Sequence, residues 1–343
     1  MDFTNFTAKE NDQGRRIDKI LKVIAEQESL SNLYKYMRKG LVRVNGKKVK
    51  ADYRVNAGDT IQLASFILAE ENESPENEVE NLENKADKKA DKKAENKSEN
   101  KSENKSENVK LNILFENENF LVINKPYNVS VHGNKDSLDA LVRSYVKTDA
   151  LSFSPGPLHR LDKKTSGILV FSKSLAGARW FTENISEHTI SKVYCAVLEG
   201  KLEEEECWND WVRSKEESGK FFHTVECSNE KKGPEWKNAQ SCARPLAYGL
   251  LDGKTVTLAE IKIKTGRKHQ IRVQSSFHEY PLAGDISYGG HKLPQKLSRD
   301  FYLAAVNLKL SDELKNNNLG FPSSIKISFE DEFFDIIKYC YIK

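Results

Sequence analysis

Residues 157–167 hold the densest group of potentially reactive side chains in the sequence. They read PLHRLDKKTSG, and the apolar run ILVF follows at once at 168–171. That run has the length and β-branched character of a buried strand, so Asp162 precedes a core element. A carboxylate in such a place is costly unless a partner such as Arg160 compensates it. Held there, it could act as a nucleophile or stabilise a developing cation. The alternative is a solvated loop with an ordinary salt bridge.

Five blocks of the sequence carry a family resemblance. The pattern HRLD-x-x-TSG at 159–167 resembles the signature of the RluA-type pseudouridine synthases. The other blocks are similar to further motifs of that family: NKPYNVSVH at 124–132, SKVY at 191–194, TGRKHQIRV at 265–273 and PLAGDISYG at 281–289. They occur in the family order and cover most of residues 109–343. One departure is Asn128, where the family often has glycine; asparagine tolerates a positive φ, so we expect the turn to survive.

The resemblance implies three catalytic residues. Asp162 corresponds to the catalytic carboxylate, which acts as sugar nucleophile or by another route. The alternative is a non-catalytic aspartate that caps a helix or forms a salt bridge. Arg272 corresponds to the arginine that pairs with this carboxylate, and a bidentate bond would fix its orientation. A plain phosphate contact is the alternative. Tyr194 corresponds to the active-site tyrosine, whose ring can stack on uracil and whose hydroxyl can take part in proton transfer. Core filling is its alternative role.

Further residues of the motifs are candidates for substrate contact. Arg160 is similar to the family arginine near the extruded base, where its guanidinium could occupy the vacated stack; a structural salt bridge is the alternative. Ile271 corresponds to an apolar residue that lines the pocket. His159 and Lys125 are further candidates, and Lys125 and His132 could support the cleft or contact phosphates.

The implied reaction is the isomerisation of uridine to pseudouridine in RNA. It breaks a glycosidic bond, turns the base and rejoins it through carbon, without redox change, so we expect no cofactor and no metal. The target base must first leave its stack. One rival is an RNA-binding protein that has lost catalysis, which the intact Asp162, Tyr194 and Arg272 argue against. A glycoside hydrolase is the other, but it usually needs two placed carboxylates.

Length and composition bound the organisation of the chain. A length of 343 residues indicates two domains. No apolar stretch is long enough for a membrane span, and the N-terminus shows no signal peptide. Five cysteines, at 195, 207, 227, 242 and 340, show no Cys-x-x-Cys pair, which predicts reduced thiols and a cytoplasmic protein. A zinc site built from Cys207, His223, Cys227 and Cys242 fits no common spacing.

Residues 12–66 predict a small basic α/β domain that binds RNA. Apolar residues at 17, 20, 21 and 24 predict one helix, and those at 33, 37 and 41 a second that ends near Gly40. Short strands should follow, with a hairpin turn at Asn45-Gly46 and further strands around Val49, Val55, Ile61 and Leu63. Between residues 15 and 54 there are twelve Lys and Arg against four acidic residues. This pattern resembles the RNA-binding domain of ribosomal protein S-four. The candidate phosphate contacts are Arg15, Arg16, Arg38 and Lys39; a solvated basic face is the alternative.

Residues 67–108 predict a charged, low-complexity linker. Over 70–108 there are 13 acidic and 8 basic side chains, so the rest of the chain holds 46 basic and 38 acidic residues. The segment has too few apolar residues to offset the entropy of ordering. The remainder of the chain is therefore basic, which is consistent with a partner that carries phosphates.

Residues 109–343 predict the catalytic domain, of the α+β class. Strands are expected at 120–123, 168–171 and 194–198, and a helix capped by Ser174 through about residue 185. The apolar phase slips near Ala259 in 256–263, which predicts a β-bulge there. The resemblance implies a mixed, largely antiparallel sheet with a central catalytic cleft. The predicted partner is RNA, ribosomal RNA of the large subunit before transfer RNA, and the protein is expected to be a monomer.

Overall fold

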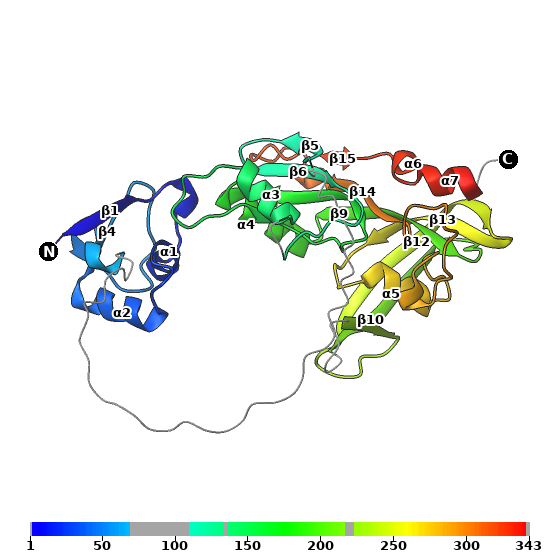
Figure 1. Cartoon of the computed structure of the whole chain (residues 1–343), viewed down its shortest axis with the longest axis horizontal. Helices are drawn as coiled ribbons and strands as arrows, with labels where there is room; N and C mark the ends of the chain where they lie inside the picture. Colours follow the sequence, from blue (N-terminus) through cyan, green and yellow to red (C-terminus); the bar gives the residue numbers. More distant parts are fainter. Residues whose placement is uncertain (1, 69–109, 134–135, 217–222, 341–343) are drawn as a thin grey trace, which may run out of the picture. The chain divides into compact units, whose positions relative to one another are not determined.

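The computed structural model describes residues 2–68, 110–133, 136–216 and 223–340. These residues divide into two compact units, of residues 2–8 and 14–68 and of residues 9–13 and 111–340 (Figure 1). The predicted linker falls almost entirely outside the described residues. Among the described residues, no helix is both long and apolar enough to cross a membrane.

The first unit packs two helices against a four-stranded antiparallel sheet of order β1-β4-β2-β3. Its elements are α1 (Ile17–Ile24), α2 (Leu30–Lys39), β1 (Phe3–Thr7), β2 (Val42–Val44), β3 (Lys47–Lys48) and β4 (Thr60–Ala64). Both predicted helices are confirmed, and α2 ends at Gly40 with a φ of 73°. The predicted turn is confirmed as well, since Asn45 and Gly46 both have positive φ and join β2 to β3.

The limits of the first unit differ from the predicted 12–66 at both ends. β1 pairs with β4 over its whole length, although its alternation was too short to predict a strand. At the other end the buried Ile67 closes the core, and its carbonyl accepts from Gln27 at 3.0 Å. Asp12 belongs to the second unit, where its carboxylate accepts from the amides of Leu151 and Ser152. Val49 and Val55, predicted as strand residues, lie outside the strands.

An eleven-stranded sheet forms the frame of the second unit, in the order β11-β10-β12-β13-β9-β14-β8-β6-β5, with β15 beside β14 and β7 beside β8. The strands are β5 (Ile113–Glu116), β6 (Phe120–Lys125), β7 (Gly156–Pro157), β8 (Ser166–Ser172), β9 (Ile190–Glu199), β10 (Glu206–Glu216), β11 (His223–Ser228), β12 (Lys237–Leu251), β13 (Lys254–Ile263), β14 (Leu303–Leu310) and β15 (Ser324–Lys326). All pairings are antiparallel except β8 with β14. The predicted mixed, largely antiparallel sheet is confirmed.

Helices cover this sheet in separate places (Figure 1). They are α3 (Leu138–Tyr145), α4 (Leu175–Ser186), α5 (Gln270–Phe277), α6 (Phe329–Glu332) and α7 (Phe334–Cys340). The predicted cap of α4 is confirmed, because Ser174 accepts from the amide of Gly177. Phe181 of α4 packs on β6 and β8, whereas α5 packs on β10, β11 and β12. Phe333 and Ile336 cover a second core over β9, β13 and β14.

The parallel contact between β8 and β14 explains the glycine of the HRLD-x-x-TSG block. Ser166 and Gly167 pair with Ala304 and Ala305, and the contact extends over those two residues alone. Gly167 has a φ of 106°, and a Cβ there would lie 2.2 Å from the carbonyl oxygen of Ala305. Only glycine fits such a close approach of two backbones. The segment that carries Asp162 therefore leads directly into β8, where β8 meets β14 near the middle of the sheet.

The predicted β-bulge lies opposite Ala259 but on the neighbouring strand. β13 pairs with β9 without interruption, whereas its register with β12 shifts between Pro245 and Ala247. The extra residue is thus Leu246 of β12. Proline lacks the amide that a regular ladder requires, which explains why the irregularity falls on that strand.

The prediction that all cysteines are reduced is wrong for two of them. Cys207 and Cys242 form a disulfide with an S–S distance of 2.01 Å. They are direct partners in the β10–β12 register, which brings together residues 35 positions apart in sequence. Their sulfurs and a carboxylate oxygen of Glu205 lie within 4.8 Å of one another. A disulfide sulfur is not a thiolate, however, so this group is not a metal site in the oxidised form. Cys195 and Cys227 are free thiols.

Candidate active site

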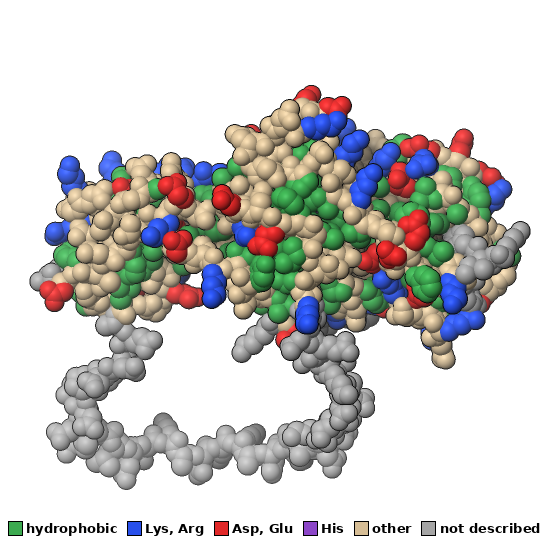
Figure 2. All heavy atoms as spheres, turned by 90° about the horizontal axis from the view of Figure 1, so that it is seen from above, with side chains coloured by type: hydrophobic (Ala, Val, Ile, Leu, Met, Phe, Trp, Pro, Cys, Tyr) green, Lys and Arg blue, Asp and Glu red, His purple; other side chains and the backbone are tan. Residues whose placement is uncertain are grey.

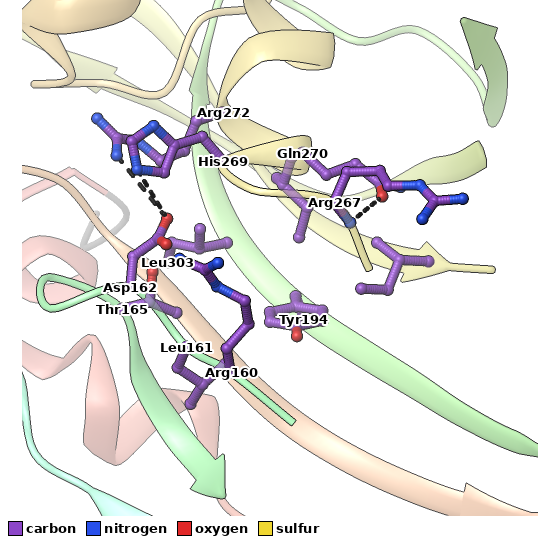
Figure 3. A pocket seen from close by; sticks show the side chains of 12 residues that line it. Arg160, Leu161, Asp162, Thr165, Tyr194, Arg267, His269, Gln270, Arg272 and Leu303 are labelled. Carbon is purple, nitrogen blue, oxygen red and sulfur yellow. Dashed lines mark hydrogen bonds and ion pairs between the residues drawn. The ribbon is translucent and has the colours of Figure 1, made fainter. Parts of the chain in front are cut away.

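Asp162 lies at the wall of a cleft built from both halves of the sheet. A cavity of about 50 Å³ is enclosed by the 157–167 segment, β9, the end of β13, the start of α5 and Leu303 of β14. A wider hollow of about 660 Å³ adjoins it and shares Asp162 with it. The Asp162 side chain is 17% exposed and faces two basic groups (Figure 3). The motif carboxylate is therefore accessible from the cleft while most of it is shielded from water.

Arg272 makes its forked bond with a different carboxylate from the one expected. Its Nε and Nη2 donate to Asp285 at 2.6 and 2.9 Å, and its Nη1 stands 3.8 Å from Asp162. The guanidinium also lies 4.8 Å from the ring centres of Tyr288 and Phe301. Burial opposes its charge, but Asp285 outweighs burial and raises the pKa of Arg272. The bidentate bond predicted with Asp162 thus goes to Asp285, and Arg272 presents its remaining nitrogen to Asp162.

A second basic group faces Asp162 from the residue before α5. Nε2 of His269 is 3.8 Å from the same carboxylate oxygen that Arg272 approaches. Its Nδ1 forms a hydrogen bond of 2.8 Å with the hydroxyl of Tyr288. Burial lowers the pKa of His269 to about 4, although Asp162 acts in the opposite direction. The imidazole is therefore neutral near pH 7.

Tyr194 lies in the centre of β9 and lines the same cavity as Asp162 (Figure 3). Its neighbours Val193 and Cys195 face the core beneath α7, so the alternation of the strand turns Tyr194 to the opposite face. Burial, and secondarily Asp162, raises the pKa of Tyr194 well above its usual range. The hydroxyl thus keeps its proton at neutral pH and can donate it.

Lys125 and His159 support the motif from inside the fold instead of facing the substrate. Lys125 is fully buried, and its Nζ donates to the carbonyls of Pro126 and Lys163 at 2.9 Å each. Burial lowers the pKa of Lys125 to about 7. His159 accepts from the amide of Val170 and stacks on Phe181, and burial lowers the pKa of His159 to about 3. Neither side chain lines the cavity, so both differ from the expected substrate contacts.

The other predicted pocket residues do reach the cleft. Ile271 is 5% exposed and lines the small cavity. Arg160 lines both hollows and is exposed, and its guanidinium makes no hydrogen bond or ion pair with the described residues. The ordinary salt bridge considered for Arg160 is thus not made there. Asn128 has a φ of 64°, so the turn predicted at that position keeps its positive φ without glycine.

The four predicted cations of the first unit fall into two kinds. Arg38 and Lys39 end α2 and are exposed, and Arg38 borders a hollow of about 390 Å³. Arg16 donates two hydrogen bonds to the buried Asp18, while Arg15 is half-buried. Figure 2 shows positive and negative side chains interleaved on the visible face of this unit, at the left. Arg38 and Lys39 are therefore the more accessible pair.

Sequence reasoning missed three residues that complete the site: His269, Tyr288 and Asp285. All three lie within the quoted blocks 265–273 and 281–289, so the blocks carried the only signal. Asp285 is 2% exposed and follows Gly284, where a Cβ would lie 1.8 Å from the carbonyl oxygen of Asp300. That tight turn directs Asp285 and Tyr288 toward Arg272, a proximity that spacing alone does not reveal.

Comparisons with known proteins agree with this geometry. Residues 119–277 match the family described as RNA pseudouridylate synthase, and residues 15–61 match the S4 domain. Ribosomal large subunit pseudouridine synthase C of Haemophilus influenzae is 26% identical over 337 residues, which cover 93% of this chain and 90% of that one. The synthase of the same name from Vibrio parahaemolyticus is 28% identical and covers 91% of each chain. The structure of human RNA pseudouridylate synthase domain containing 4 shares the fold, with a TM-score of 0.51 and 21% identity over 67% of this chain and 94% of its own. The chain therefore carries a region of residues 119–277 that matches the RNA pseudouridylate synthases, isomerases that convert uridine in RNA to pseudouridine, and an S4 domain before it.

Proposed function

We propose that the protein converts specific uridines of large-subunit ribosomal RNA to pseudouridine, with Asp162 as the catalytic carboxylate. The observation that carries the proposal is the convergence of Asp162, Tyr194 and Arg272 on one cleft. The choice of ribosomal RNA rests on the relatives named ribosomal large subunit pseudouridine synthase C, which match this chain over nearly its full length. Such a substrate favours action in the cytoplasm.

The proposed sequence of events begins with extrusion of the target uridine into the cleft. Arg160, exposed at the rim, is positioned to take the place of the extruded base. Asp162 then acts at the sugar, as nucleophile or as electrostatic partner of the cationic sugar, while the glycosidic bond breaks. One chain supplies all of these side chains, which supports a monomer.

Tyr194 is proposed to hold the detached uracil and to donate a proton. Burial keeps the hydroxyl protonated at neutral pH, so its part in a proton transfer would begin with donation. Tyr194→Phe keeps the stacking ring and removes the hydroxyl. We expect kcat to fall by about 10²-fold, within the usual range for acid–base groups, with little change in RNA affinity. Single-turnover pseudouridine formation on a short RNA measures this. Wild-type kcat in the variant would limit Tyr194 to stacking.

The substrate is tested by mapping pseudouridine in total RNA from cells with and without the gene. We expect specific sites in large-subunit ribosomal RNA to lose the modification, and to regain it with wild-type protein but not with Asp162→Asn. Loss confined to transfer RNA would overturn the choice of ribosomal RNA while leaving the activity. Unchanged pseudouridine in all RNA, together with inactivity of the purified protein, would contradict the function itself.

A further inference from the structure

Two hydrogen bonds connect the amide of Val225, the hydroxyl of Tyr288 and the imidazole of His269, and the imidazole faces Asp162. The amide of Val225, in β11, donates to the hydroxyl of Tyr288 at 3.2 Å. The same hydroxyl is 2.8 Å from Nδ1 of His269. Nε2, on the other side of that ring, points to Asp162 at 3.8 Å (Figure 3). The chain of contacts thus joins a strand remote in sequence to the reacting group.

The hydrogen bonds of Tyr288 favour one tautomer of the imidazole. The hydroxyl of Tyr288 already accepts from an amide, which can only donate, so its own proton is free to point at Nδ1. Nδ1 is then the acceptor of that bond. A neutral imidazole carries one proton, so when Tyr288 donates to Nδ1 that proton is on Nε2, the nitrogen that faces Asp162.

The charge state agrees with this assignment. Burial lowers the pKa of His269 to about 4, and Arg272 and Lys268 add to that effect while Asp162 opposes it. The ring is therefore neutral across the physiological range. An Nε2–H of a neutral ring can donate to Asp162 without adding a second full positive charge beside Arg272.

The backbone holds His269 in a conformation that few residues adopt at low cost. Its φ is 50° and its ψ 22°, in the left-handed region, at the residue that caps the start of α5. Such a conformation is strained for most residues other than glycine, though His, Asn and Asp are enriched there. In this conformation the ring reaches both the Tyr288 hydroxyl and the Asp162 carboxylate.

We propose that His269 is a positioning residue for Asp162, held by Tyr288 as the tautomer that carries its proton on Nε2. This rests on the proposed function of Asp162. Arg272 and His269 both approach the same oxygen, Oδ2, at 3.8 Å, and Oδ1 has no hydrogen bond with the described residues. The two donors would tighten onto Oδ2 in the reacting complex and leave Oδ1 directed at the sugar.

The first test removes the imidazole and keeps the backbone. His269→Asn tolerates a positive φ but is too short to reach Asp162. We expect kcat to fall by about 10- to 100-fold, the size of one hydrogen bond to a charged group, with KM for RNA within about threefold. Tyr280→Phe is the matched control, since the Tyr280 hydroxyl is bonded to Glu206 outside the site. A kcat within twofold of wild type in folded His269→Asn would overturn the proposal.

The second test isolates the role of Tyr288. Tyr288→Phe removes the hydroxyl but retains the ring beneath Arg272. We expect a loss of about 3- to 10-fold in kcat that disappears in the His269→Asn background, because the hydroxyl acts through the imidazole. Equal losses in both backgrounds would show that Tyr288 acts by another route and would overturn the proposed coupling.

A spectroscopic measurement tests the tautomer without relying on turnover. In the full chain labelled with ¹⁵N at its seven histidines, the signals absent from His269→Asn identify the ring. We expect a protonated Nε2 and an unprotonated Nδ1 in wild type, and mixed tautomers in Tyr288→Phe. A proton on Nδ1 would overturn the assignment. If Asp162→Asn stayed active, the proposed function itself would fail. If Asp162→Asn were inactive and His269→Asn had wild-type kcat, the positioning role of His269 would be refuted and the proposed function would stand.

Discussion

The two units of the protein place their charges in opposite ways. In the first unit the accessible cations, such as Arg38 and Lys39, are exposed and unpaired within that unit's described residues. In the catalytic unit Arg272 is 9% exposed and Asp285 only 2%, and the two form a hydrogen-bonded ion pair. Exposed charges are screened by salt, and their effect on RNA affinity depends mainly on how many of them contact phosphates. A buried charge instead acts through the positions of the few groups that it contacts.

This difference separates two contributions to one reaction. Exposed cations raise RNA affinity in a salt-dependent way and carry little information about which bond breaks. In the proposed mechanism, the buried Arg272 and Asp285 would add little to affinity but would orient the Asp162 carboxylate. Changes in the catalytic unit should therefore lower kcat, and changes in the first unit should lower affinity.

The largest effect is expected from Asp162→Asn, which keeps size and removes charge. We expect kcat to fall by about 10³-fold or more, with RNA affinity within about threefold of wild type. Asp300→Asn is the matched control. Asp300 is 58% exposed and pairs with Lys164, which lies in the 157–167 segment beside Asp162. Release of tritium from RNA labelled at C5 of uridine measures turnover, and a binding assay in parallel measures affinity. Near-normal turnover in Asp162→Asn would remove it from the chemistry.

A comparable pair of buried acids sharpens the comparison between the units. Asp285 and Asp18 are each almost fully buried and accept a forked bond from an arginine. Asp285→Asn should lower kcat by about 10²-fold, since Arg272 loses the partner that orients it. Asp18→Asn should instead loosen the first unit and leave kcat at saturating RNA unchanged. Equal effects of the two changes on kcat would contradict the division between binding and chemistry.

The sequence predicted those parts of the fold that depend on local pattern. The helix at Ile17–Ile24 and the turn at Asn45-Gly46 follow from periodicity and from residues that tolerate positive φ. The Cys207–Cys242 disulfide did not follow, because antiparallel register brings the two together over 35 positions. Local spacing carries no information about that register.

The site shows the same limit. The quoted motifs bring Asp162, Tyr194, Ile271 and Arg272 to one cavity, as the resemblance implied. The identity of Arg272's main partner could not be predicted, since Asp162 and Asp285 are both carboxylates within the motifs. Of the two roles considered for Lys125, its burial favours support of the cleft over contact with a phosphate, because its ammonium group donates to two carbonyls. The sequence of a motif is the same in either case.

An intermediate effect is expected from Lys125→Met, and it depends on pH. The pKa of Lys125 is lowered to about 7 in the folded state, against an unfolded value near 10.4. Between these values the unfolded chain binds more protons, so this residue makes the unfolding free energy rise with pH, by up to roughly 4 kcal/mol. The stability of wild type relative to Lys125→Met should therefore increase from pH 7 to about 10. Denaturant unfolding across this range checks it, with the exposed Lys163→Met as control. A difference that does not change with pH would contradict the lowered pKa of Lys125.

The smallest effect is expected from Arg38→Ala with Lys39→Ala. Each exposed cation that contacts a phosphate contributes about 0.7–0.9 to the slope of log affinity against log salt. The double variant should therefore bind RNA a few-fold more weakly at moderate salt, with a slope shallower by about 1.5, and keep wild-type kcat at saturating RNA. Lys254→Ala with Lys326→Ala removes the same charge from exposed positions of the catalytic unit and serves as the matched control. An equal change of slope in both double variants would mean that net charge alone attracts the RNA. A change confined to the α2 pair would assign phosphate contacts to the end of that helix, and would show that the first unit contributes affinity while the buried group contributes chemistry.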